Sequence, residues 1–439
     1  STFSFFDSNH TVFRNLTHSI GNQFTDNRII VSRNSSNLLN LVIVVTHFLC
    51  LVFNRINHFG NCLIDTTFNI HRACTGSSCT DDENNGQGNN IIYGENIIGN
   101  GEQTFEIKDH QYLKRGTYLM KGWCYVTYGS TLTIEAGTVI KGDKETRAAL
   151  IVEPGGKLIA RGTVDAPIVF TSEMPAGKRK PGDWGGLILC GYARNNEDIM
   201  QIEGGPRTMH GGPNNADNSG VLSYVRVEFA GYPFKKNQEI NGITFGSVGN
   251  GTQIDHLQVS YANDDAFEWF GGTVHAEYLV AYHCWDDDFD IDNGYSGTCR
   301  HLLGIRHPRI ADITGSHAFE CSNNGTNTPA TPTTAATFED VTIYGPASGD
   351  ASFVNHPDFI NGGGLRPENE SMLGLFGAAL YMGNNTSVTF RNCRISGYPS
   401  DMEGTPASAD NVVFSEREET GYPEWTQRWC NFNPQETEY

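Results

Sequence analysis

The first eighty residues of this 439-residue chain lack four common residue types. Glutamate first occurs at Glu83, lysine at Lys108, methionine at Met120 and proline at Pro154. A natural segment of that length normally contains several lysines and glutamates, because these are among the commonest residues. The absence argues against a native folded domain, and we expect residues 1–78 to be mistranslated, signal-like or leader-like sequence. A divergent N-terminal domain is the alternative.

This region also lacks an apolar run long enough to cross a membrane. Its longest one, LLNLVIVVTHFLCLVF, covers residues 38–53 and is interrupted by Asn40, Thr46 and His47. A transmembrane helix needs about 20 consecutive apolar residues. The sequence therefore predicts no stable membrane-spanning helix here.

Cysteine pairs with Cys-x-x-Cys spacing are absent, so the 11 cysteines indicate no zinc or redox site. Cys79 stands apart, because it lies in TGSSCTDDENNGQGNN, after small residues and before an acidic segment rich in Asn and Gly. This stretch resembles the lipid-attachment cysteine and export signal of Bacteroidetes lipoproteins, which implies outer-membrane anchoring through a lipid. An ordinary disordered linker is the alternative. We expect residues 79–104 to be a flexible tether and residues 105–439 to form the folded domain.

Positive charge is scarce throughout the chain. There are 30 Lys and Arg against 50 Asp and Glu, which gives a formal net charge of -20. Such a balance argues against nucleic acid or an anionic membrane as the main partner. It is compatible with cation binding and with neutral or polar polymers.

A sustained helical period is missing as well. Short β-rich runs such as STLTIEAGTVIKG, GGLILCGYA and SVTFRNCRISGY are separated by turns rich in Gly, Asn, Asp and Pro. Consecutive runs recur about every 20–30 residues, as Val259, Val280 and Ile305 illustrate, and this period is typical of one coil of a parallel β-helix. A β-propeller or a sandwich is the alternative fold.

Longer motifs carry a family resemblance. The segments ALIVEPGGKLIARGTVDAPIVFTS, GDWGGLILCGYA and EINGITFGSVGNGTQIDHLQVSYANDDAFEWFGGTV are similar to a family of secreted or surface-attached bacterial proteins, common in Bacteroidetes. The similarity covers about residues 117–439. It implies a right-handed parallel β-helix of the pectate-lyase-like superfamily, with loop excursions. Because most members are uncharacterised, it implies fold and location rather than activity.

An acidic pattern repeats at the coil period. NDDAFEWFGG begins at Asn263 and DDDFDIDNG begins at Asp286. The two align with an offset of 22, which places Asp264 on Asp286, and AFE of GSHAFECSNNG matches them again. Side chains alternate along a strand, so an inward stack of phenylalanines would place carboxylates outward on three coils. The predicted outward carboxylates, which are also the catalytic candidates, are Glu268, Asp290 and Glu320.

Like charges in register on coils about 4.8 Å apart repel one another. A Ca²⁺ ion bound between the stacked carboxylates would reduce this repulsion, and so would a proton shared between two of them. The third alternative is that the carboxylates are simply solvated. The same alternation places Asp265 and Asp287 inward unless a bulge re-aims them. The predicted calcium ligands are Asp264, Asp265, Glu268, Asp286, Asp287, Asp288, Asp290, Asp292 and Glu320.

The acidic coils are consistent with either glycoside hydrolysis or sugar binding. The order of the motifs NDD, DDD and GSH along this chain resembles the order of the acidic and His-bearing coils in polygalacturonase-like glycosidases. The downstream Arg-x-Lys signature of those enzymes has no clear counterpart in this chain. Aromatic rings stack on sugars, which favours a binding role for rings near these coils. The predicted substrate-binding residues are Trp269, Tyr282, Trp285, Tyr295 and His317.

We therefore expect a secreted or outer-membrane surface protein that binds extracellular carbohydrate, or a similar polymer, through a calcium-binding acidic face. A polysaccharide hydrolase or lyase acting at the same face is the first alternative, so the sequence leaves open whether the protein is an enzyme. A structural adhesin or stalk is the second.

Overall fold

The computed structural model describes residues 92–439 apart from 94–95, 236–237, 348–351, 362–371 and 419–420. The predicted non-native segment 1–78 and Cys79 therefore lie outside the described residues. Within the described part, we find no helix with the length and hydrophobicity needed to span a bilayer.

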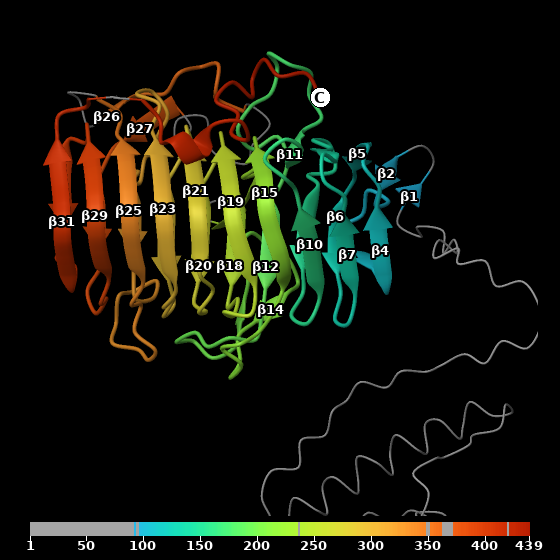
Figure 1. Cartoon of the computed structure of the whole chain (residues 1–439), viewed down its shortest axis with the longest axis horizontal. Helices are drawn as coiled ribbons and strands as arrows, with labels where there is room; N and C mark the ends of the chain where they lie inside the picture. Colours follow the sequence, from blue (N-terminus) through green and yellow to red (C-terminus); the bar gives the residue numbers. More distant parts are fainter. Residues whose placement is uncertain (1–91, 94–95, 236–237, 348–351, 362–371, 419–420) are drawn as a thin grey trace, which may run out of the picture. The chain divides into compact units, whose positions relative to one another are not determined.

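Two long sheets, with strands side by side from coil to coil, form a parallel β-helix (Figure 1). This confirms the predicted fold class. The sheet that we call the site sheet contains β3 (Phe105–Ile107), β6 (Trp123–Val126), β9 (Ala149–Val152), β12 (Leu187–Cys190), β18 (Ile243–Gly246), β20 (Phe267–Phe270), β22 (Phe289–Asp292), β24 (Phe319–Cys321), β28 (Ala378–Met382) and β30 (Ser400–Glu403).

The second sheet, which we call the corner sheet, bends along its length. All of its pairs are parallel except β1 with β2. It contains β1 (Ile92–Tyr93), β2 (Ile97–Ile98), β4 (His110–Leu113), β5 (Thr117–Met120), β7 (Thr131–Ile134), β8 (Val139–Gly142), β10 (Lys157–Arg161), β11 (Ile168–Ser172), β15 (Gly220–Glu228), β19 (Gln253–Ser260), β21 (Ala276–Tyr282), β23 (Thr298–Ile305), β25 (Thr337–Tyr344), β29 (Thr389–Ser396) and β31 (Ser408–Ser415).

Among the described residues, three short hairpins and a 3-10 helix lie outside the two long sheets. They are β13 (Met200–Gln201) with β14 (Met209–His210), β16 (Pro233–Lys235) with β17 (Gln238–Glu239), β26 (Ser352–Val354) with β27 (Leu373–Leu375), and the 3-10 helix η1 (Glu424–Thr426).

The bend of the corner sheet is made in two ways. In the early coils, the loop 162–167 separates β10 from β11, and the two halves of β15 then pair with one of these strands each. From β15 onward, a single left-handed residue per coil replaces the loop. These residues occupy equivalent positions on successive strands, and we call them the corner ladder: Tyr224, His256, Tyr278, His301, Asp340, Asn392 and Asn411.

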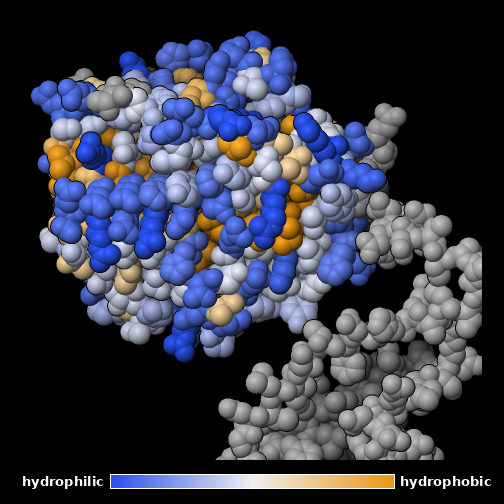
Figure 2. Space-filling model, viewed as in Figure 1, coloured by the Kyte–Doolittle hydropathy of each residue, from blue (hydrophilic) through white to orange (hydrophobic). Residues whose placement is uncertain are grey.

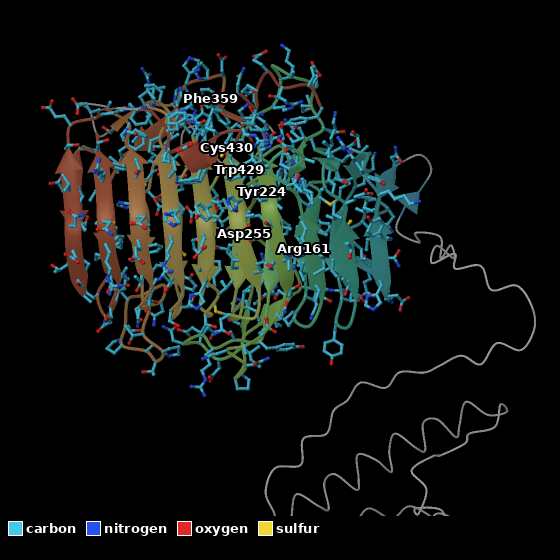
Figure 3. The ribbon with its side chains drawn as sticks, in the orientation of Figure 1. Arg161, Tyr224, Asp255, Phe359, Trp429 and Cys430 are labelled. Atoms are coloured by element: carbon cyan, nitrogen blue, oxygen red, sulfur yellow. The ribbon has the colours of Figure 1, made fainter. Side chains whose placement is uncertain are left out.

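Ring stacking accompanies the strained backbone of the corner ladder. The backbone φ angles of its seven residues lie between 51° and 61°, a region that residues other than glycine seldom adopt. Ring centroids lie 4.1 Å apart for Tyr224 and His256, 4.4 Å for His256 and Tyr278, and 4.6 Å for Tyr278 and His301. The rings thus gain contacts that offset part of the backbone strain. Figure 3 labels Tyr224 beside Trp429 of the C-terminal segment.

Stacked apolar side chains fill the interior, while hydrophilic residues cover most of the face in Figure 2. Phe267, Phe289 and Phe319 are fully buried and stack with centroid distances of 5.7 and 5.0 Å. The predicted internal phenylalanine stack is therefore confirmed. Regular structure starts before residue 105, since β2 pairs with β5 and Ile98 is buried, so part of the predicted tether joins the first coil.

Candidate functional site

The three predicted outward carboxylates lie side by side on the site sheet. Glu268 of β20 is in register with Asp290 of β22, which is in register with Glu320 of β24. Their neighbours Phe267, Phe289 and Phe319 point into the core, as the alternation of side chains requires.

These carboxylates line a small depression, which we call the acidic pocket, with a volume of about 300 Å³. Ten of its twelve lining residues carry a carboxyl group. The twelve are Glu203, Glu239, Asn241, Asp264, Asp265, Glu268, Asp286, Asp287, Asp290, Asp312, Thr314 and Glu320.

Asp265 and Asp287 join this pocket instead of the interior. Both precede their strands, in irregular segments where the alternation of a strand does not apply, so the inward placement expected from parity is wrong. Each accepts a hydrogen bond from the next coil: the backbone N–H of Asp287 donates to Asp265 Oδ1 at 2.8 Å, and that of His317 donates to Asp287 Oδ1 at 2.5 Å. These bonds fix the two carboxylates at the same edge of successive coils.

Carboxylate oxygens converge at three points of the site. In each group of three residues, one ligand atom per residue lies within 4.8 Å of the other two. The groups are Asp265 with Glu268 and Asp290, Asp264 with Asp265 and Asp286, and Asp287 with His317 and Glu320. Two of the three groups consist of carboxylates alone.

The pocket holds its acidic groups under mutual repulsion. Burial, followed by repulsion from neighbouring carboxylates, keeps the pKa of Asp265, Glu268 and Asp290 well above the usual range. The amide of Asn241 donates a hydrogen bond to Glu268 Oε2, whereas Asp290 Oδ1 is buried and has no hydrogen-bond partner among the described residues. A bound cation or a shared proton would relieve this repulsion.

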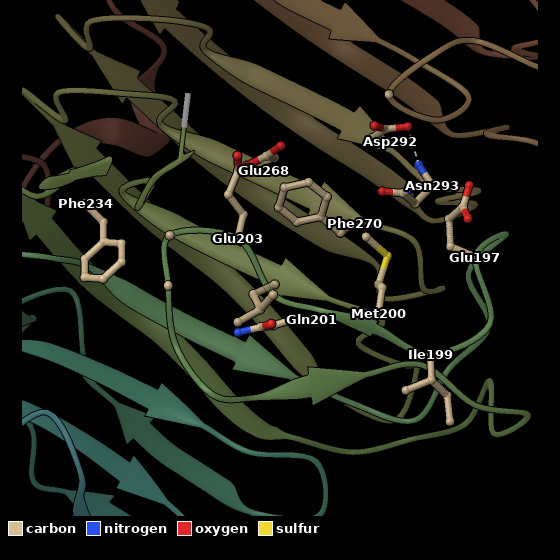
Figure 4. Close-up of a pocket in the computed structure, with 14 residues that line it drawn as sticks. Glu197, Ile199, Met200, Gln201, Glu203, Phe234, Glu268, Phe270, Asp292 and Asn293 are labelled. Carbon is tan, nitrogen blue, oxygen red and sulfur yellow. Dashed lines mark hydrogen bonds between the residues drawn. The ribbon is translucent and has the colours of Figure 1, made fainter. Parts of the chain in front are cut away.

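A larger groove of about 1120 Å³ adjoins the acidic pocket and shares Glu203 and Glu268 with it (Figure 4). Burial and the nearby Glu239 raise the pKa of Glu203 to about 7, and burial raises the pKa of Asp292 to about 6. The groove is lined by Glu197, Ile199, Met200, Gln201, Ile202, Glu203, Gly204, Gly205, Phe234, Glu268, Phe270, Asp292, Asn293 and Gly325.

A family model described as a pectate-lyase-like β-helix domain matches residues 105–426, which is well over half of the chain. The chain belongs to this pectate-lyase-like β-helix family. Membership indicates a carbohydrate-related role. Neither the curated proteins nor the solved structures contain a match to the chain.

Two predicted metal ligands of this pectate-lyase-like β-helix lie outside the acidic pocket. Asp288 is fully buried and forms an ion pair with Arg306, whose Nη1 lies 3.1 Å from Asp288 Oδ1. The missing side chain of Gly304 makes room for it, because a Cβ there would lie 2.7 Å from Asp288 Oδ2. Asp288 is therefore a structural charge, and its prediction as a metal ligand is wrong. Asp292 lines the larger groove instead.

The aromatic predictions fail because the rings are buried. Trp269 and Tyr295 lie in the core and stack on each other with centroids 5.4 Å apart. Trp285 and Tyr282 are buried in a second apolar cluster, where the Tyr282 hydroxyl donates to the Phe432 carbonyl. A sugar cannot stack on a ring whose faces are covered, so none of these four is a binding platform.

His317 lies at the edge of the acidic pocket. Its Nδ1 is 2.7 Å from the Ala378 carbonyl oxygen, and its Nε2 is 3.9 Å from Glu320 Oε2. Burial lowers the pKa of His317 despite the nearby carboxylate. A neutral ring that donates from Nδ1 would present a lone pair on Nε2, which suits a ligand or hydrogen-bond acceptor rather than a stacking surface.

The residues that line the larger groove were not predicted from the sequence. The excursion between β12 and β15 supplies Glu197–Gly205, and the hairpin β16–β17 supplies Phe234. Glu203 carries no periodic signal, because it lies outside the coils. The length of the interval between β12 and β15, far longer than a turn, was the available sign that this region builds a wall.

Proposed function

We propose that this β-helix protein acts outside the cytoplasm, at the cell surface or in secreted form, and binds carbohydrate polymers with the help of Ca²⁺ in the acidic pocket. The observation that carries the proposal is the convergence of carboxylate oxygens from Asp265, Glu268 and Asp290 within 4.8 Å of one another. The buried and unpartnered Asp290 Oδ1 in the same group supports it.

The donor set fits calcium. Ca²⁺ takes oxygen ligands at about 2.3–2.6 Å, so two ligands of one ion lie at most about 5 Å apart. The two groups that consist of carboxylates alone meet this limit, and the Asn241 amide and the pocket's hydroxyl at Thr314 add neutral oxygens nearby. When bound, the ion would supply positive charge and open coordination positions for sugar hydroxyls. The residues of the chain hold the ligands in register through the backbone bonds to Asp265 and Asp287.

Polymer binding is favoured by the neighbouring groove. Its volume of about 1120 Å³ exceeds that of a single-ion site, and it contains the half-buried ring of Phe234 and the exposed side chain of Gln201 beside the carboxylates. An apolar ring next to polar groups matches the mixed surface of a sugar. The family membership supports the same class of ligand.

Hydrolysis of the polymer is the second candidate, because of Glu203. With its pKa raised to about 7, Glu203 would keep its proton in about half of the molecules at neutral pH, which suits a general acid in glycoside hydrolysis. Its neighbour Glu268 lines both the groove and the acidic pocket and would serve as the second carboxylate.

Calcium titration calorimetry and polysaccharide affinity electrophoresis test the proposal together. We expect Ca²⁺ to bind and to raise the melting temperature, and chelation to weaken retention by polysaccharide. Asp265→Asn and Asp290→Asn should each lower calcium affinity at least tenfold, because each removes a charged ligand. Asp401→Asn, at an exposed position of β30, is the matched control and should bind like the wild type.

Two results would decide against parts of this proposal. If calcium leaves the melting temperature and the polysaccharide retention unchanged, the metal site is wrong. If incubation with a retained polysaccharide releases reducing ends, and Glu203→Gln abolishes that release, the protein is a hydrolase rather than a binding protein.

A further inference from the structure

Exposed apolar side chains gather at one place on the surface. Four of the ten large hydrophobic side chains exposed among the described residues line a single pocket of about 440 Å³. They are Tyr128, Tyr192, Ile199 and Met209, which are 76%, 37%, 64% and 47% exposed. Scattered exposed hydrophobic residues are ordinary, but a contiguous group of this kind marks a binding surface.

The two tyrosines are held by the same turn. A Cβ on Gly155 would lie 2.4 Å from the Tyr128 ring, so the ring rests directly on the glycine backbone. The Tyr192 hydroxyl donates a hydrogen bond to the Pro154 carbonyl at 3.2 Å. Both rings are therefore positioned by residues 153–156 while they remain open to solvent, which lowers the entropy lost when a ligand stacks on them.

Polar groups border this pocket. Arg207 forms ion pairs with Glu153 at 3.0 Å and with Glu106 at 2.8 Å, and its guanidinium lies 4.4 Å from the centre of the Tyr125 ring. Glu153, Arg207 and His210 all line the pocket beside the tyrosines. Planar rings next to fixed charged donors and acceptors match a sugar, which has an apolar C–H face and hydroxyls at its rim.

The pocket adjoins the larger groove. Ile199 lines both, and the larger groove in turn shares Glu203 and Glu268 with the acidic pocket. Figure 4 shows Ile199 at one side of the larger groove, well away from Glu203 and Glu268. Three adjoining depressions thus form one path across the site sheet and its excursion. A chain of linked units can occupy such a path, whereas a single small molecule cannot.

We propose that Tyr128 and Tyr192 form a stacking subsite for neutral sugar units of a polysaccharide whose neighbouring units lie in the larger groove. This inference rests on the proposed function, and it adds the ligand class and the direction of the bound chain. Neutral units are favoured because the path leads to a pocket with ten carboxyl-bearing residues, more than the charge of one bound calcium ion would balance, so the pocket would repel a polyanion.

A tryptophan probe at the subsite provides the direct test. Five of the six tryptophans are buried, namely Trp123, Trp184, Trp269, Trp285 and Trp429, so Tyr128→Trp adds an exposed indole to a mostly shielded background. It also preserves the aromatic ring. We expect acrylamide to quench the emission of Tyr128→Trp, and a retained neutral polysaccharide to protect it from quenching and shift it to shorter wavelength.

Affinity measurements with neutral oligosaccharides of increasing length complete the test. Wild-type affinity should rise with length, and the double variant Tyr128→Ala/Tyr192→Ala should lose about tenfold or more for the long oligosaccharides but little for the short ones. Tyr112→Ala is the matched control, because Tyr112 is a 45% exposed tyrosine on β4 that does not line the path.

The outcomes separate this inference from the proposed function. If wild type binds polysaccharide and the tyrosine double variant binds equally well at every length, the subsite is wrong and the proposed function stands. If wild type binds an anionic polysaccharide but no neutral one, the inference is wrong and the proposed function stands, whereas binding of no polysaccharide at all would make both wrong. A concentration-dependent dimer that the double variant abolishes would overturn the sugar subsite in favour of a self-association surface.

Discussion

At the scale of single residues, the site is a set of acidic groups that the fold brings together at a cost in free energy. A carboxyl group prefers to ionise in water, and burial beside other carboxylates opposes that ionisation. Glu203 illustrates the effect, because its pKa rises from 4.5 to about 7 through burial and the nearness of Glu239 and Asp292. The folded protein therefore binds a proton more tightly at Glu203 than the unfolded chain does.

This difference predicts a pH-dependent stability. Between about pH 4.5 and 7 the unfolded chain has lost the Glu203 proton while the folded protein keeps it, so the contribution of Glu203 to stability falls as the pH rises through this window. Glu203→Gln removes the effect. In chelator, we expect the variant to match wild type near pH 4.5 and to be more stable by about 2 kcal/mol at pH 7.5.

Urea unfolding at both pH values measures this difference. The comparison between the two proteins matters, because His210 and His307, whose pKa values burial lowers to about 4, change stability in the opposite direction and affect both equally. A variant that is no more stable than wild type at pH 7.5 would show that Glu203 ionises normally.

At the scale of elements, the corner ladder replaces loops by single residues. Each left-handed residue other than glycine costs about 1 kcal/mol or more in backbone strain. Asn, Asp and His tolerate this conformation better than most residues, which accounts for five of the seven positions. The two tyrosines are exceptions, and they occur only where their rings stack on histidines.

Substitutions at His256 should distinguish strain from stacking. His256→Ala loses the stacks with Tyr224 and Tyr278 and keeps the strained backbone, so we expect a loss of about 1–3 kcal/mol in unfolding free energy. His256→Gly loses the same ring contacts and the same hydrogen bond to Asp255 Oδ1 but relieves the strain, so it should be the more stable of the two. Equilibrium denaturation measures both. An alanine variant as stable as the glycine variant would mean that strain at this corner is negligible.

The element scale also shows how far sequence could lead. The 22-residue offset gave the register of β20 and β22 correctly, because stacked coils repeat the same pattern of buried and exposed residues. Alternation did not apply at Asp265 and Asp287, which precede their strands, whereas at Trp269 it indicated the core correctly, because Trp269 shares the inward parity of Phe267, and the predicted binding role disregarded it. The groove wall around Glu203 was not predicted, because the excursion that forms it does not repeat from coil to coil and therefore carries no periodic sequence pattern.

At the scale of the whole molecule, the C-terminal segment ties distant coils together. Trp429 is buried against Tyr224 and His256, with ring centroids at 5.9 and 5.7 Å. Farther on, Arg179 donates to the carbonyls of Pro434 and Thr437, both at 2.7 Å. A β-helix otherwise has contacts mainly between neighbouring coils, so such a segment adds long-range cooperativity.

Removal of the Trp429 side chain should loosen the C-terminal segment. Trp429→Ala should lower the unfolding free energy by about 3–5 kcal/mol, because it leaves a large cavity against the corner ladder. Limited proteolysis should then cleave the segment 421–439 before the coils, since local unfolding becomes less costly. Gln427→Ala, at an exposed position of the same segment, is the control and should leave both measurements unchanged. Equal protease resistance of Trp429→Ala and wild type would contradict the anchoring role.

The corner also bears on how such a protein can change over time. In one coil the chain passes the bend of the corner sheet with the six residues 162–167, and in later coils it does so with a single residue. The strands on either side of the bend nevertheless pair with the same neighbouring strands. Insertions and deletions at this edge therefore leave the stacking order intact. New surface loops can be acquired there coil by coil, on a face separate from the acidic pocket, and the same edge offers an engineer positions for grafted peptides.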